Sequence, residues 1–287
     1  MARIAYVNGR FLRHAHASVH VEDRGFQFAD AIYEVWALLD GRLADMDGHL
    51  ARLERSLSEL EIVMPMSPEA LLLVLRETVR QNRVRNGLVY LQISRGQARR
   101  DHVIPDPPPL PTIVITVRAV DPVALNAKAA RGAGVISAPD IRWGRCDIKT
   151  VGLLPNVLAK TAAKRAGCAE VWFVDAGGLV TEGGSTNAWI VDATGTLRTR
   201  NIEANILRGV TRANLLDLAR ELQVPVDERA FTVADVKSAR EAFFTAASAF
   251  VTPVTSIDGA VVGDGRPGPV AMRLRELYMR QAGENAV

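Results

Sequence analysis

Five of the seven residues from 105 to 111 are prolines, and this run constrains the fold more than any other stretch of the chain. Proline has a fixed backbone angle and no amide hydrogen, so such a run cannot pair within a sheet. Before it, Leu88–Ser94 alternate as a strand does, and after it Thr112–Val120 are rich in β-branched side chains. The sequence therefore predicts two strands joined by an extended surface loop.

Turn residues and helical spacing predict the elements before this loop. Asn8-Gly9 and Asp40-Gly41 tolerate the positive φ of a tight turn, so each pair is expected to join the two strands of a hairpin. Leucines share one helical face from Gly48 to Leu60. Ser67-Pro68 then has the cap and the first-turn proline of a helix start, and this second helix should run to about Arg83.

The pattern loosens after Val120, where we predict a linker. The predicted division is an N-terminal domain of residues 1–118, a linker of residues 119–126 and a C-terminal domain of residues 127–287. Mixed strands and helices predict a two-domain α/β or α+β protein with a ligand cleft between the domains. In the second half the expected strands are 134–137, 169–175, 187–192 and 242–245, and the expected helices are 153–166, 211–222, 233–239 and 269–281.

Charge and cysteine content narrow the class of protein. A formal charge of +3, from 35 Lys and Arg against 32 Asp and Glu, is too small and too evenly spread to favour nucleic acid, so we expect small-molecule partners. Cys146 and Cys168 fit a reducing compartment and form no metal-ligand pattern, so no metal site is predicted. With neither a leader pattern nor an apolar run of about 18 residues, a soluble cytoplasmic protein with no membrane partner is expected.

Lysines are rare, with 5 among the 35 basic residues, and base composition alone explains the many arginines. Because arginine stays protonated, each lysine is a position where a neutral amine could be required. Lys128, Lys160, Lys164 and Lys237 are expected to be solvated surface residues. Lys149 differs, because it lies among apolar residues just before a helix, where an amine can be partly desolvated and attack a carbonyl. The alternative is a lysine that only extends from a strand end.

Three other segments carry groups that could hold a phosphorylated cofactor. Glu182 ends a predicted strand before glycines and polar side chains, although a lone glutamate in such a turn is usually just exposed. Leu207–Arg212 precedes a helix capped at Thr211 or a neighbour, and its free amides could bind phosphate or could simply be capped. Arg52, among helical leucines, could face a phosphate or be structural. An amine, a carboxylate and a helix start are the parts needed to hold pyridoxal phosphate.

With these parts the chain resembles the fold-type-IV pyridoxal-phosphate enzymes, and most of all the D-amino-acid transaminases of that group. The resemblance implies an α/β (α+β) fold with a smaller N-terminal α/β domain and a larger C-terminal pseudo-barrel domain. It also implies the cofactor pyridoxal 5'-phosphate and a homodimer. The matching stretches run in order along nearly the whole chain and are 22–34, 49–53, 94–102, 140–154, 181–187 and 207–212.

The resemblance assigns roles to the cofactor-binding residues one by one. It implies that Lys149 is the catalytic residue, which forms the Schiff base and then moves a proton. It places Glu182 at the pyridine nitrogen, where a carboxylate keeps the ring protonated. Arg52 and the amides of Val210 and Thr211 would hold the phosphate. The implied cofactor-binding set also contains Ser185, Thr186, Asn187 and Leu207.

The resemblance also assigns the substrate-binding residues. Arg100 and His102 match an arginine and a histidine that trap the substrate α-carboxylate from the neighbouring subunit, and Tyr33 would add a hydroxyl. The alternative is that the basic residues here are simply exposed. Two departures bear on cofactor affinity: Gly184 stands where a serine is common, and Ala246-Ala247 stand where hydroxyl residues often occur.

The implied function is the reversible transfer of an amino group from a D-amino acid to a 2-oxo acid such as 2-oxoglutarate. The alternatives of the same fold are a branched-chain L-amino-acid transaminase, an (R)-amine transaminase and an aminodeoxychorismate lyase. A hypothesis of another class is a phosphate-binding protein that keeps the fold without catalysis. The presence of both Lys149 and Glu182 counts against it.

Overall fold

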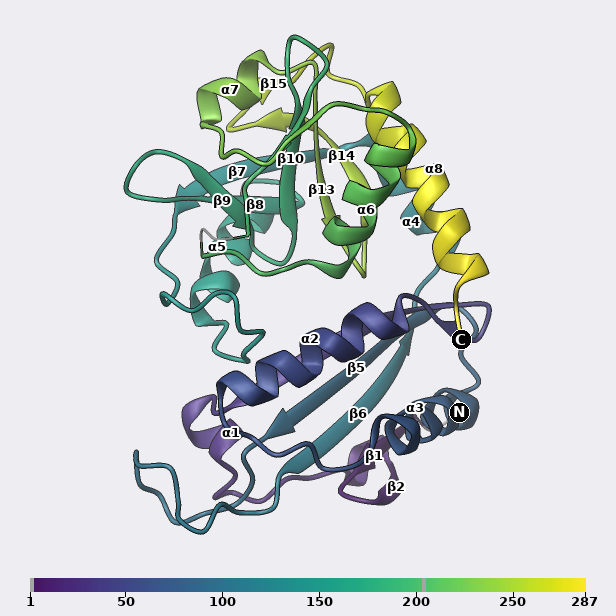
Figure 1. The fold of residues 1–287 in the computed structure, drawn as a ribbon, viewed down its shortest axis with the longest axis vertical. Helices are drawn as coiled ribbons and strands as arrows, with labels where there is room; N and C mark the ends of the chain where they lie inside the picture. The colour runs from purple at the N-terminus through teal and green to yellow at the C-terminus, as the bar shows by residue number, and fades with distance from the viewer. Residues whose placement is uncertain (1–2, 203–204) are drawn as a thin grey trace. The chain divides into compact units, whose positions relative to one another are not determined.

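The computed structural model describes residues 3–202 and 205–287, and the chain forms two compact units (Figure 1). The first unit comprises Met1–Asp121, Ile148–Gly152 and Asn285–Val287. The second comprises Pro122–Asp147 and Leu153–Glu284. The domain ranges predicted from the sequence are each continuous. In the structure, however, Ile148–Gly152 and Asn285–Val287 belong to the first unit. As a result, Lys149 belongs to the same unit as the N-terminal sheet.

An antiparallel sheet of six strands forms the first unit, in the order β2-β1-β6-β5-β3-β4. Both predicted hairpins are confirmed, since Asn8-Gly9 and Asp40-Gly41 turn with positive φ between paired strands. The proline-rich run is confirmed as a loop without regular structure between β5 and β6. The strands are β1 (Ile4–Val7), β2 (Arg10–Arg13), β3 (Ala31–Leu39), β4 (Arg42–Leu43), β5 (Gly87–Ser94) and β6 (Thr112–Ala119).

Two helices, α2 (Met46–Glu59) and α3 (Pro68–Asn82), pack against this sheet, and both were predicted from the sequence (Figure 1). Ser67 caps α3 by accepting a hydrogen bond from the amide of Ala70. Leucines of both helices join every second residue of β5 and β6 in one apolar core. The other face of β5 is only partly buried, because its side chains point away from the helices. The sheet therefore has one packed and one more open face.

The second unit contains a sheet of nine strands in the order β12-β11-β10-β13-β14-β7-β8-β9, with β15 paired to β14. The edge strand β9 also contacts β10, so the sheet curls toward closure, as the pseudo-barrel expectation requires. The strands are β7 (Ala133–Pro139), β8 (Glu170–Val174), β9 (Val180–Gly183), β10 (Asn187–Val191), β11 (Leu197–Thr199), β12 (Val226–Asp227), β13 (Glu241–Ala246), β14 (Phe250–Ile257) and β15 (Ala260–Val261).

Helices α6 and α8 lie against each other and against this sheet (Figure 1). The predicted helices α5, α6, α7 and α8 are present with small shifts at their ends. Helix α4 was not predicted, and it begins within the residues 119–126 that the sequence assigned to a linker. The bounds are α4 (Pro122–Arg131), α5 (Leu154–Arg165), α6 (Val210–Glu221), α7 (Val233–Ser238) and α8 (Pro269–Glu284).

The sequence also missed β14, a central strand of the second sheet. Its proline, Pro253, lies opposite Phe243 of β13, and a register shift between Val254 and Ser256 interrupts the pairing with β7. Proline donates no ladder hydrogen bond and is rare inside sheets, so residues 250–257 carry a weak strand signal. The register with β13 nevertheless runs through Pro253 without a shift.

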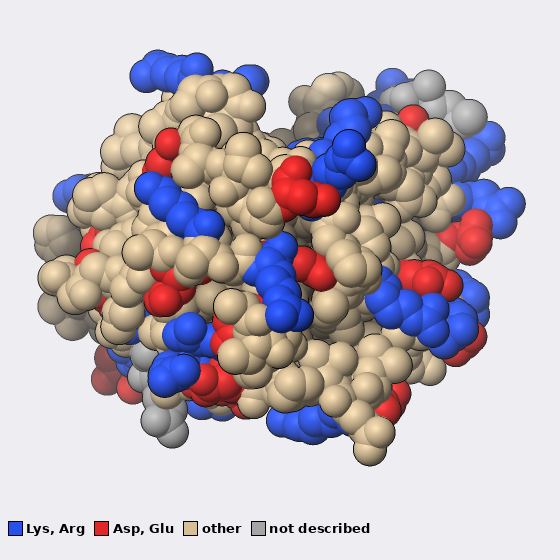
Figure 2. Space-filling model, turned by 90° about the horizontal axis from the view of Figure 1, so that it is seen from above, with Lys and Arg blue, Asp and Glu red and all other residues tan. Residues whose placement is uncertain are grey.

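Charged side chains are mixed on the molecular surface. Figure 2 shows lysines and arginines interspersed with acidic residues over the face in view, and no continuous basic patch is visible there. This agrees with the small formal charge of +3. Within residues 3–202 and 205–287, no helix combines the length and apolar character needed to cross a membrane.

Candidate functional site

The short segment that carries Lys149 is fixed beside β3 in the first unit. The amide of Tyr33 donates to the Lys149 carbonyl at 3.0 Å, and the amide of Val151 donates to the Ala31 carbonyl at 3.1 Å. The Lys149 Nζ atom lies 4.2 Å from the centroid of the Tyr33 ring. The structure therefore brings the predicted catalytic amine close to a predicted substrate residue. Backbone hydrogen bonds fix the two segments that carry them.

Tyr33 belongs to a polar strip on the more open sheet face. Its ring stacks on Tyr90 with 5.7 Å between centroids, and the Tyr90 hydroxyl donates to Gln92 Oε1 at 2.8 Å. Burial, with a contribution from Tyr33, raises the pKa of Tyr90 to about 12, so this hydroxyl keeps its proton. Neither Tyr90 nor Gln92 was predicted from the sequence as a site residue, although the alternation of the strand places both on one face.

Arg52 is held by a carboxylate inside the first unit. Glu34 is completely buried, and its Oε1 and Oε2 accept hydrogen bonds from Arg52 Nε at 2.7 Å and Nη2 at 2.8 Å. Burial by itself raises the pKa of Glu34, but the charge and hydrogen bonds of Arg52 outweigh it and hold that pKa well below its usual value. Glu34 is therefore ionised, and it fixes the plane of the Arg52 guanidinium.

His49 completes this cluster as a neutral ring. Burial lowers its pKa, although the nearby Glu34 carboxylate opposes that effect. Its Nδ1 lies 2.8 Å from Glu34 Oε2, and a neutral ring satisfies that contact by donating from Nδ1. Within the described residues its buried Nε2 has no hydrogen-bond partner. The sequence placed His49 in a matching stretch but gave it no role.

Arg100 and His102 come together over one aromatic side chain of the first unit. The Arg100 Cζ atom lies 5.3 Å from the centroid of the Phe28 ring, and the ring of His102 lies 5.4 Å from the same centroid. Arg100 and His102 are exposed to solvent, while Phe28 is half-buried. Phe28 was not predicted, because its contact with these residues bridges segments far apart in the sequence.

In the second unit, donors surround the carboxylate of Glu182 at the end of β9. Its Oε2 accepts from Asn187 Nδ2 and from the Leu207 amide, both at 3.1 Å, and its Oε1 accepts from Arg142 Nη1. The side chain is buried, with 5% of the residue exposed. Donors to both oxygens favour the charged form of a carboxylate and fix its direction. Three predicted cofactor residues, Glu182, Asn187 and Leu207, therefore form one network.

Arg142 was not predicted as a site residue, although it lies within a matching stretch. Besides Glu182, it binds Asp140 through two parallel hydrogen bonds of 2.9 and 2.7 Å, and its Cζ lies 4.8 Å from the centroid of Phe173. Burial raises the pKa of Asp140, but Arg142 more than offsets this and lowers it below its usual value. A fully ionised Asp140 thus fixes the arginine that in turn contacts Glu182.

The start of helix α6 offers backbone amides rather than a side-chain cap. The sequence predicted a cap at Thr211 or a neighbour; the N-cap is Gly209, two residues before Thr211, and glycine has no side chain with which to cap the helix. Amides of a first helical turn lack intrahelical acceptors, and they can bind an anion such as phosphate. Val210 and Thr211 occupy this turn. The buried Thr211 hydroxyl lies 3.3 Å from the Tyr278 hydroxyl of α8.

Ser185 and Thr186 follow Glu182 in the turn between β9 and β10. Lys160 is not a freely solvated residue as expected, because its Nζ binds both oxygens of the buried Glu170 at 3.0 Å and the Ser185 hydroxyl at 3.1 Å. Thr186 is buried, and in the described part of the chain its hydroxyl has no hydrogen-bond partner. A Cβ added to Gly184 would lie 2.7 Å from the Lys160 side chain.

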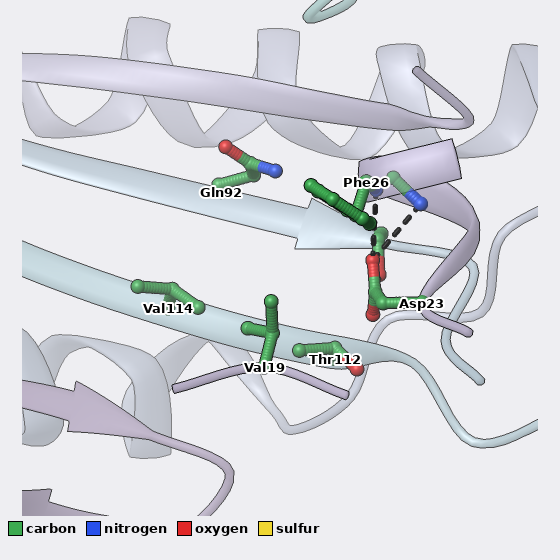
Figure 3. A pocket seen from close by; sticks show the side chains of 8 residues that line it. Val19, Asp23, Phe26, Gln92, Thr112 and Val114 are labelled. Carbon is green, nitrogen blue, oxygen red and sulfur yellow. Dashed lines mark hydrogen bonds between the residues drawn. The ribbon is translucent and has the colours of Figure 1, made fainter. Parts of the chain in front are cut away.

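A small cavity of about 150 Å³ opens on the first sheet (Figure 3). Ligand pockets usually have volumes of about 300–1,000 Å³, so it is small for a cofactor. None of the predicted site residues lines this cavity. Figure 3 shows the Asp23 carboxylate accepting hydrogen bonds from nearby backbone amides. Its lining residues are Val19, Asp23, Gly25, Phe26, Gln92, Ser94, Thr112 and Val114.

Comparison with known proteins gives one consistent family. A family model described as amino-transferase class IV matches residues 31–257. A D-alanine aminotransferase of Listeria innocua serovar 6a is 37% identical over 276 residues, which are 96% of this chain and 94% of the relative. A D-alanine aminotransferase of Staphylococcus haemolyticus is 38% identical over 273 residues, covering 95% of each chain.

Solved structures show the same fold. A branched-chain amino acid aminotransferase from T.th. with pyridoxamine 5'-phosphate has a TM-score of 0.89 and 26% identity, and the match covers 99% of this chain and 96% of that one. A hypothetical aminotransferase of Mycobacterium tuberculosis has a TM-score of 0.84 with 23% identity, which supports the fold alone. That match covers 98% of this chain and 99% of the other.

Proposed function

The chain belongs to the class IV aminotransferases, and from this premise we propose that it moves the amino group of a D-amino acid to a 2-oxo acid such as 2-oxoglutarate. It is a pyridoxal-phosphate-dependent enzyme of fold type IV. The observation that carries the D-amino-acid assignment is the pairing of Arg100 and His102 over Phe28, because it presents two donors together for a carboxylate. The relatives named for D-alanine support the same choice.

The residues of both units fit the cofactor. The α6 start without a side-chain cap and the buried, unpartnered Thr186 hydroxyl are groups that an anionic ligand would satisfy. We propose that Arg52 and the amides of Val210 and Thr211 hold the phosphate. Glu182 would pair with the ring nitrogen. Ser185, Thr186, Asn187 and Leu207 complete the proposed cofactor-binding set.

Lys149 is the proposed catalytic residue. The bound cofactor supplies an electrophilic carbon and an electron-accepting ring. Lys149 would hold the cofactor through its amine, and its Nζ would be the group that moves a proton at the substrate α-carbon. Tyr33, whose ring lies 4.2 Å from this Nζ, lines the substrate side.

We further propose a cytoplasmic homodimer. The two cysteines, Cys146 and Cys168, are free thiols, which suits a reducing compartment. In the dimer, Arg100 and His102 of one subunit would bind the substrate carboxylate at the site of the other. A trap shared in this way would make the dimer the active form.

A substrate panel tests the proposed function. Purified enzyme loaded with cofactor should convert D-alanine and D-glutamate with 2-oxoglutarate, and chiral product analysis should show D-products. Arg100→Gln should raise KM for D-alanine by about tenfold or more, since a bidentate carboxylate contact is lost. Preference for branched L-amino acids would contradict the proposal in favour of the activity named for the branched-chain aminotransferase from T.th.. Equal activity of the wild type and Arg100→Gln with an (R)-amine that lacks a carboxylate would favour an amine transaminase.

A further inference from the structure

We propose that Arg24 is a positioning residue for substrate recognition, because it holds the backbone of residues 101–103 and so keeps Arg100 and His102 on Phe28. The inference rests on the proposed role of Arg100 and His102 in binding the substrate carboxylate. In this role Arg24 does not itself bind substrate or cofactor. It acts through the loop that carries Arg100 and His102.

The Arg24 guanidinium is buried and reaches three consecutive carbonyls. Only 3% of the residue is exposed. Its Nη1 donates to the carbonyl of Asp101 at 2.6 Å and to that of Val103 at 3.3 Å, and its Nη2 lies 3.5 Å from that of His102. These contacts span 77 to 79 positions of sequence. One side chain therefore fixes the main chain on both sides of His102.

A carboxylate keeps Arg24 in place from the other side. Asp30 Oδ2 accepts from Arg24 Nε at 2.8 Å and also from Arg95 Nε at 2.7 Å. Burial raises the pKa of Asp30, yet the hydrogen bonds of Arg95 and Arg24 outweigh that effect and lower it. The guanidinium is thus compensated by a charged partner, and its remaining donors are directed at the loop.

Helix α1 (Arg24–Phe28) carries both parts of this support. Asp23 caps it by accepting from the amides of Gly25 and Phe26, as Figure 3 shows. Arg24 and Phe28 are four residues apart, hence on one side of the helix, and the Arg24 Cζ lies 4.9 Å from the Phe28 ring. The same ring contacts Arg100 and His102. One capped turn therefore presents the ring and the anchor together.

The loop needs such an anchor because it has no regular secondary structure of its own. Residues 100–104 are exposed, and the prolines that follow cannot pair with a strand. A free loop would lose conformational entropy each time it placed Arg100 and His102 around a carboxylate. A lysine at position 24 has a single charged nitrogen, so it cannot serve three carbonyls and Asp30 in the fixed geometry of a guanidinium.

Arg24→Lys in the full-length, cofactor-loaded enzyme tests this role. We expect KM for both D-alanine and 2-oxoglutarate to rise by about tenfold, while kcat falls less than about threefold, because substrate positioning is lost and the cofactor machinery is not. Cofactor affinity, measured by equilibrium dialysis, should stay unchanged. Limited proteolysis after residue 102 should become faster than in the wild type.

Arg95→Lys is the matched control. Arg95 is buried to a similar degree, with 4% exposed, and shares Asp30, but its other donors reach the carbonyls of Leu60 and Glu61. It should lower thermal stability comparably and leave KM near the wild-type value. Equal KM changes in both variants would show that Arg24 has only a structural role.

Two further variants separate the ways in which the inference can fail. If Arg100→Gln leaves KM unchanged, the proposed carboxylate trap itself is wrong. If Arg100→Gln raises KM and Arg24→Lys does not, the role of Arg24 is wrong. Should Arg24→Lys fail to fold, Phe28→Leu takes its place. Phe28→Leu should raise KM, whereas Phe28→Tyr, which keeps the ring, should not. A normal KM in Phe28→Leu overturns the inference.

Discussion

At the scale of single residues, the buried charge of Glu34 is paired with side chains that fix its orientation. Glu34 is fully buried, yet it is ionised because Arg52 and His49 bind both its oxygens. Charged groups in an apolar interior are tolerated only when paired and hydrogen-bonded. The pair thereby presents an oriented guanidinium on α2, which is the form of arginine suited to a phosphate.

Glu34→Gln should therefore destabilise the protein at neutral pH. The amide removes the counter-charge that Glu34 gives to the buried Arg52, which costs about 3–5 kcal/mol in unfolding free energy. Because the folded-state pKa of Glu34 lies below its usual 4.5, the contribution is present above that pH and is lost as pH falls toward the folded value. Urea unfolding of both proteins at pH 7 and pH 4 measures the difference, which should shrink at the lower pH.

An exposed carboxylate provides the comparison for this prediction. Glu77 binds Arg80 one turn away on the surface of α3, so Glu77→Gln should leave the unfolding midpoint nearly unchanged. If Glu34→Gln were no more destabilising than Glu77→Gln, the buried pair would not contribute as argued.

At the scale of elements, the turn between β9 and β10 explains one departure from the family pattern. Gly184 stands at a position where a serine is common in the enzymes that this chain resembles. A side chain there would approach Lys160, the buried Glu170 oxygen at 2.9 Å and Val171 at 2.9 Å. The ion pair between Lys160 and Glu170 occupies the space, so glycine and the pair belong together.

Gly184→Ser should consequently destabilise the protein although it adds only a hydroxymethyl group. Overpacking of this kind typically costs about 1–3 kcal/mol. Thermal unfolding followed by circular dichroism gives the shift. Gly283→Ser is the control, because a Cβ at Gly283 of α8 meets no atom within 4 Å. A stable Gly184→Ser variant with an unchanged melting temperature would mean that Lys160 simply moves aside.

Elements with a clear local signal were predicted, and those with a weak or interrupted signal were not. The hairpin at Asn8-Gly9 and the helix after Ser67 follow from turn and cap residues, and the structure confirms both. The strand β14 was missed because Pro253 weakens its strand signal, although it pairs with β13, its neighbour in sequence, as well as with the distant β7. Among the candidate site residues, Lys149 and Glu182 were singled out from their sequence context, and the family resemblance then assigned their roles. Arg24 was not singled out, since its proposed role depends on carbonyls 77 to 79 residues away.

At the scale of the whole molecule, the first unit is assembled from separate parts of the chain. Val287 and Leu43 exchange backbone hydrogen bonds of 2.7 and 2.9 Å, and the segment bearing Lys149 pairs with β3. An N-terminal fragment would thus lack both the proposed catalytic amine of Lys149 and the hydrogen bonds between Leu43 and Val287. Experiments on the site therefore require the full chain.

Hybrid dimers test whether the carboxylate trap acts across subunits. Lys149→Ala and Arg100→Gln chains, coexpressed with different tags and purified through both, would form a dimer in which each chain carries one defect. If the trap comes from the partner, one site combines the intact Lys149 of one chain with the intact Arg100 of the other, while the second site has both defects. Because dimers are symmetric apart from these changes, kcat should be about half the wild-type value, with wild-type KM for D-alanine.

The parent proteins define the opposite result. Lys149→Ala alone should be inactive, and Arg100→Gln alone should have a raised KM. If Arg100 served the site of its own chain, the only site of the hybrid with an intact Lys149 would contain Arg100→Gln, and the hybrid would show that raised KM. Failure to isolate a doubly tagged dimer from soluble, active protein would contradict the proposed assembly. The value of KM in the hybrid thus decides which subunit supplies the trap.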